Sequence, residues 1–143
     1  MKHLTLFLAL GLFLVGLNFQ SCGFAADAEE AEKYVDEWYD NLKAKDYDAL
    51  MAMVDEEGLE ANSEEEWRTV LQQKEALGEI KSIEKDVGFS ANSSDDVTTV
   101  TLDYTVEYDL VTIYERIKMV KRGEEYKVLS YQYNEDKSRL ENL

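Results

Sequence analysis

The chain has 143 residues and a formal net charge of −16 at pH 7, and it contains a single cysteine and a single histidine. This length fits one domain, and one cysteine cannot form an intramolecular disulfide. So acidic a chain repels nucleic-acid phosphates and anionic lipid headgroups, so we expect no nucleic-acid partner and a covalent anchor for any membrane attachment. The histidine is His3, which leaves no histidine for a catalytic triad or a metal site in the rest of the chain. We therefore expect neither a cofactor nor a bound metal.

The first 21 residues have the composition of a secretory signal peptide. Lys2 and His3 give the chain a positive start, and residues 4–17 form an almost purely apolar run. That run is shorter than the ~20 apolar residues that a transmembrane helix needs, and it matches the apolar region of a signal peptide. We predict that residues 1–21 are removed and that the protein is exported.

Cys22 stands directly after Ser21. This pair resembles the bacterial lipobox, in which a small residue precedes a cysteine whose thiol receives diacylglycerol before cleavage. The resemblance implies that residues 22–27 form a lipidated tether, and that Cys22 anchors the protein to a membrane of the cell envelope. The alternative is ordinary signal-peptidase cleavage at the small residues of Gly23-Phe24-Ala25.

The segment from Ala28 to about residue 45 has the periodicity of an amphipathic helix. Its apolar residues recur every three or four positions against an acidic opposite face, and Trp38 is one of them. Trp67 has the same kind of position on a later helix. Both indoles are therefore predicted to be buried.

Two further helices are predicted after the first. Asp46 is suited to cap a second, short helix, and Gly58 would end it. Ser63 and Glu66 have the spacing of a capping box that begins a third helix, which Gly78 would end. The sequence thus predicts three consecutive helices.

From Ile80 onward the apolar residues recur at every second position, which is typical of strands. The alternation is clearest between residues 99 and 108. Broken alternation near residues 129–130 predicts a β-bulge in the last strand. Turns between four strands are expected at residues 92–96, 109–112 and 122–124.

Helices followed by alternating strands define an α+β fold. We predict three N-terminal helices packed on a strongly curved four-stranded antiparallel sheet that wraps round the first helix. This single domain would span residues 28–134, and residues 135–143 would be a polar tail.

Short aromatic-rich motifs resemble those of one group of small exported proteins. The matching positions are Trp38, Lys45-Asp46-Tyr47, Trp67, Leu77-Gly78, Glu115-x-Ile117-x-Met119 and Tyr126-x-Val128-x-x-Tyr131. Together they are similar to the nuclear-transport-factor-2-like, or cystatin-like, families, and most similar to the family called domain of unknown function 4019. The resemblance implies a cone-shaped fold with room for a pocket between sheet and helices. It implies no reaction, because that family has no established catalytic residues.

Glu115 is the candidate with the most chemical interest. Strand alternation places it on the apolar face with Ile113 and Ile117. Desolvation there favours the protonated carboxyl that a general acid needs. The alternative is a structural role, in which Glu115 bonds to a helix backbone group or a tyrosine, because a buried carboxylate without a partner is costly.

Tyr104, Tyr108 and Tyr131 are candidates to line a ligand pocket, and the alternative is that they are core aromatics. Two functional classes remain. The first is a lipid-anchored, non-catalytic binding or accessory module that holds a small apolar ligand or docks another envelope protein. The second is a small isomerase- or dehydratase-like pocket enzyme that uses Glu115 with a tyrosine. A cavity of roughly a few hundred Å³ containing Glu115 would favour a ligand or an enzyme, and a filled interior would favour docking.

Overall fold

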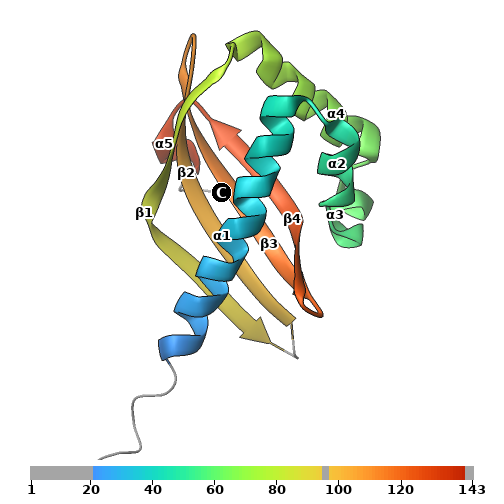
Figure 1. Ribbon diagram of the computed structural model, residues 1–143, viewed down its shortest axis with the longest axis vertical. Helices are drawn as coiled ribbons and strands as arrows, with labels where there is room; N and C mark the ends of the chain where they lie inside the picture. Colours follow the sequence, from blue (N-terminus) through green and yellow to red (C-terminus); the bar gives the residue numbers. More distant parts are fainter. Residues whose placement is uncertain (1–20, 95–96, 141–143) are drawn as a thin grey trace, which may run out of the picture.

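The computed structural model describes residues 21–94 and 97–140 (Figure 1). The predicted signal peptide lies outside the described residues except for Ser21, so its removal stays a prediction. In the described part, a series of helices precedes an antiparallel sheet whose four strands follow one another in the order β1-β2-β3-β4. The α+β class that the sequence predicts is confirmed.

The sheet is a meander in which each strand pairs with the next. Its strands are β1 (Ile80–Ser94), β2 (Val97–Tyr108), β3 (Thr112–Arg122) and β4 (Glu125–Asn134). Every second side chain of β2 from Val100 to Tyr108 is buried, as the alternation predicts. The predicted bulge is also confirmed, because Lys118 pairs with Ser130 and Met119 pairs with Val128, which leaves Leu129 as the extra residue.

Helix α1 (Ser21–Ala44) lies across one face of the sheet (Figure 1). Residues 22–27, the predicted lipidated tether, are helical and belong to α1. Contacts with the sheet extend to this end: Ala28 is buried, and the Asp27 carboxylate accepts a hydrogen bond of 3.1 Å from the Tyr126 hydroxyl. The side chain of Cys22 is outside the described part, so lipid attachment stays a prediction.

The segment after α1 forms more helices than predicted: α2 (Tyr47–Ala52), α3 (Glu56–Ala61), α4 (Glu64–Gln73) and the 3₁₀ turn η1 (Lys74–Leu77). The predicted caps are present, since Asp46 accepts a hydrogen bond from the Ala49 N–H and Ser63 forms its capping box with Glu66. Gly78, with φ of 90°, ends η1 as expected.

The prediction that Gly58 ends the second helix is wrong, because Gly58 lies inside α3. The helix breaks earlier, where β4 pairs with the backbone on either side of Val54: the Val128 N–H donates to the Met53 carbonyl, and the Asp55 N–H donates to the Val128 carbonyl, both at 2.8 Å. A Cβ at position 58 would lie 2.8 Å from the Leu129 carbonyl oxygen. Close approach to β4 therefore explains this glycine.

The segment that was predicted to be a polar tail packs in part against the domain. Residues Lys137–Leu140 form a helical turn, α5, and the Leu140 side chain is buried. The Arg116 guanidinium donates to the Leu140 carbonyl at 2.9 Å and forms two hydrogen bonds with the Asp103 carboxylate. The sequence pattern missed this contact because a single leucine among charged residues has no periodicity.

The core lies between the helices and the sheet, and both tryptophans are in it. Trp38 is fully buried, Trp67 is 5% exposed, and their rings meet edge to face at 6.3 Å. The predicted burial of both indoles is confirmed. Within residues 21–94 and 97–140, no helix is long and apolar enough to span a membrane.

Candidate functional site

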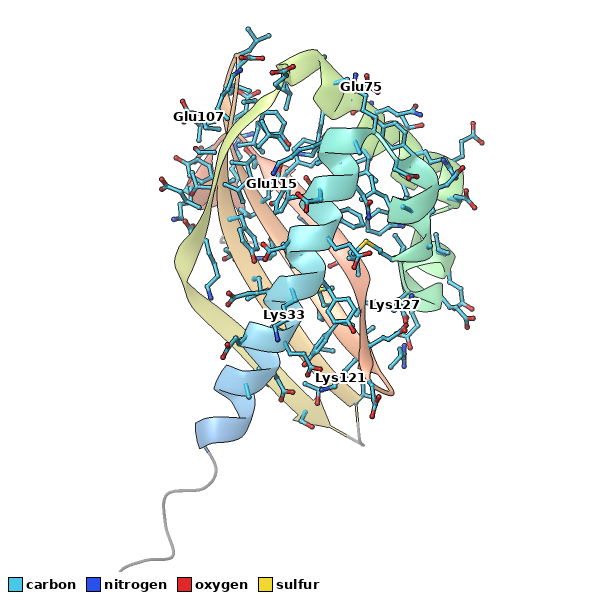
Figure 2. All side chains as sticks on the ribbon, viewed as in Figure 1. Lys33, Glu75, Glu107, Glu115, Lys121 and Lys127 are labelled. Atoms are coloured by element: carbon cyan, nitrogen blue, oxygen red, sulfur yellow. The ribbon has the colours of Figure 1, made fainter. Side chains whose placement is uncertain are left out.

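Glu115 lies at the centre of the sheet and is fully buried. On β3 it pairs with Tyr104 of β2 on one side and with Tyr133 of β4 on the other. Figure 2 shows it in the interior, near the C-terminal half of α1. The apolar-face position that strand alternation predicts is confirmed.

The Glu115 carboxylate accepts three hydrogen bonds from other side chains. The Lys74 ammonium donates to Oε1 at 2.6 Å, and the Tyr108 hydroxyl donates to the same oxygen at 3.1 Å. The Tyr39 hydroxyl donates to Oε2 at 2.9 Å. These donors satisfy a carboxylate that would otherwise be too costly to bury, so the geometry fits the structural alternative for Glu115.

Lys74 supplies the positive charge of this cluster. It is only 3% exposed, and its Nζ lies 4.2 Å from the ring centroid of Tyr133, 5.1 Å from that of Tyr131 and 5.4 Å from that of Tyr108. Burial lowers the pKa of Lys74, and the Glu115 carboxylate counteracts this effect. The carboxylate partner and the three aromatic faces both stabilise the charged form of the lysine.

The tyrosines around Glu115 either donate hydrogen bonds to its carboxylate or pack their rings around the ion pair. Burial, reinforced by the nearby Glu115 carboxylate, raises the pKa of Tyr39 and of Tyr108, so both hydroxyls stay protonated and can donate. Burial and the same carboxylate also raise the pKa of Tyr131. The Tyr131 hydroxyl is fully enclosed and makes no hydrogen bond of good geometry with the described residues, although Glu115 is near.

The structure brings together some of the predicted site residues. Tyr108 and Tyr131 lie at Glu115, whereas Tyr104 packs edge to face against the Tyr39 ring at 5.6 Å and faces a different cleft. Sequence reasoning missed Tyr39 and Lys74. A signal was available: Tyr39 follows the buried Val35 by one helical turn, and Lys74 follows the buried Leu71 in the same way.

Two surface clefts reach the cluster from outside. One, of about 570 Å³, is lined by Lys74, Tyr108 and Tyr47 among others. The other, of about 610 Å³, is lined by Lys74, Tyr133 and Ile113 among others. Glu115 lines neither of them. Among the described residues, no group of three or more His, Cys, Asp or Glu side chains is placed to hold a metal ion.

The fold and this cluster define a small α+β domain whose interior contains the ion pair between Lys74 and Glu115. No protein-family model matches the chain, and no curated protein matches its sequence. Membership of a nuclear-transport-factor-2-like family is therefore a proposal that depends on the motifs in the sequence.

Proposed function

We propose that the protein is a lipid-anchored bacterial envelope protein that acts as a non-catalytic binding or accessory module, with a cystatin-like fold. The observation that supports this proposal best is the environment of Glu115. The Glu115 carboxylate accepts hydrogen bonds from three protein donors and lines none of the described clefts. With Lys74 in place, these protein donors hold the positions from which a substrate would contact the carboxylate, which weakens the alternative of a pocket enzyme.

The position of α1 suggests how such a module would face its partner. The N-terminal end of α1 projects from one end of the molecule, while η1 and the turn between β2 and β3 lie at the opposite end (Figure 1). A helix of 24 residues is about 36 Å long. A lipid on Cys22 would therefore hold the η1 end away from the membrane.

The end opposite the proposed anchor has features of a docking surface. Leu110, in the turn between β2 and β3, is 77% exposed and is an exposed large apolar side chain among the described residues. The cleft of about 570 Å³ is at the same end, with Ile80, Tyr108 and Asp109 in its wall. We propose another envelope protein as the partner, because this end combines an exposed leucine with a cleft that has apolar and aromatic side chains in its wall.

Lipid attachment can be tested by feeding a bacterial host with labelled palmitate. The wild-type chain should take up the label, and the Cys22→Ser variant should not, because a hydroxyl cannot replace the thiol that receives the lipid. Ser21→Ala, which keeps a small residue before the cysteine, should remain labelled. Stable anchoring needs two acyl chains or a second signal. A wild-type chain that has no label and is recovered in the soluble fraction would therefore refute the anchor.

A further inference from the structure

The surroundings of the Lys74 ammonium form a compact cage. Its floor is the Glu115 carboxylate, and its walls are the rings of Tyr108, Tyr131 and Tyr133, whose centroids lie 4.2–5.4 Å from Nζ. We call these four side chains the ammonium cage. A carboxylate combined with aromatic faces is the chemistry by which proteins recognise organic cations.

The cage is close to solvent although its occupant is buried. Lys74 itself lines both adjoining clefts, Tyr108 lines one of them, and Tyr133 lines the other. The occupant is attached only through a flexible aliphatic stem at the first residue of η1. A free cation could therefore enter along the path that the lysine stem now fills.

We propose that the ammonium cage is a binding site for a primary alkylammonium group, and that Lys74 occupies it as a tethered ligand in the free protein. The ligand class includes polyamines and the lysine side chains of other proteins. This site is separate from the proposed anchor, and its test does not depend on lipid attachment.

The geometry of the cage sets its selectivity. The hydrogen bond of 2.6 Å between Nζ and Glu115 Oε1 requires an N–H donor, which a quaternary ammonium lacks. The three rings favour a cation over a neutral alcohol. In the wild-type chain the tethered lysine competes for the cage at high effective concentration. An external amine should therefore bind weakly to the wild-type protein.

The Lys74→Ala variant removes the tethered ligand and leaves the cage empty. The test compares the melting temperature of this variant, as purified full-length chain in detergent, with and without n-butylammonium chloride, at constant ionic strength. Bound ligand should raise the melting temperature by about 4–8 °C at a concentration that fills most of the sites. If the variant is unfolded without ligand, circular dichroism should show that n-butylammonium restores the fold.

Three controls separate this proposal from general effects. Lys74→Met fills the space of the stem without a charge, and its melting temperature should not respond to n-butylammonium. Butan-1-ol and n-butyltrimethylammonium should have little effect on Lys74→Ala. Equal responses of the alanine and methionine variants, equal responses to all three compounds, or no response of Lys74→Ala would each overturn the proposal.

Discussion

Replacing Trp38 with alanine should lower the free energy of unfolding by about 3–5 kcal/mol. Trp38 is fully buried, and its ring contacts those of Trp67 and Tyr131, with centroids 6.3 and 5.8 Å away. A domain of this size has a total stability of about 5–15 kcal/mol, so this loss would threaten the folded state. Urea unfolding followed by circular dichroism measures the change.

Trp38→Phe is the matched control for that experiment. It keeps an aromatic ring in the core, and the indole N–H that it removes has no hydrogen-bond partner among the described residues. Its cost should be clearly smaller than that of Trp38→Ala. A loss below about 1 kcal/mol for the alanine variant, the size of an average substitution, would contradict the packing of α1 on the sheet.

Glu115→Ala should also cost about 3–5 kcal/mol, because it leaves the Lys74 ammonium buried without its counter-charge. Two tyrosine hydroxyls would lose their acceptor as well. Urea unfolding is again the measurement. Pairing Glu115→Gln with Lys74→Met removes both charges and keeps an acceptor oxygen for one of the two tyrosines.

This double variant should be markedly more stable than Glu115→Ala, because no uncompensated charge remains. If Glu115→Ala alone were as stable as the wild type, the ion pair would not be buried as described. If the double variant were no more stable than Glu115→Ala, the charge of Lys74 would not be the cause of the loss.

Much of the fold follows from local patterns in the sequence. Alternation located β2, the capping residues Asp46 and Ser63 begin helices where expected, and broken alternation located the bulge at Leu129. Each of these signals comes from residues that are close together along the chain. Such signals can be recognised in the sequence because each depends only on the geometry of a single helix or strand.

The errors arise where distant segments meet. The break between α2 and α3 depends on the pairing of Val54 with Val128. Leu140 is buried at a place where Arg116 of β3 donates a hydrogen bond to its carbonyl. No local pattern encodes such contacts, so they could not be predicted from one sequence.

The candidate site was predicted in part for the same reasons. Alternation placed Glu115 on the apolar face, but its partner Lys74 is 41 residues away in the sequence. A lysine at a core-facing helical position counts as polar in a hydrophobic pattern, so the pattern does not mark it as buried. A buried carboxylate requires a cationic or hydrogen-bond-donating partner. A glutamate on the apolar face of a strand therefore indicates that a lysine or another donor on the helices is also buried.

The most direct test of the proposed function is the intact mass of the mature protein, extracted with detergent from bacterial membranes. The proposal predicts a chain that begins at Cys22 and has the added mass of a diacylglycerol group with or without a further acyl chain. An unmodified chain that begins at Ala26 or later, found outside the membrane fraction, would contradict it.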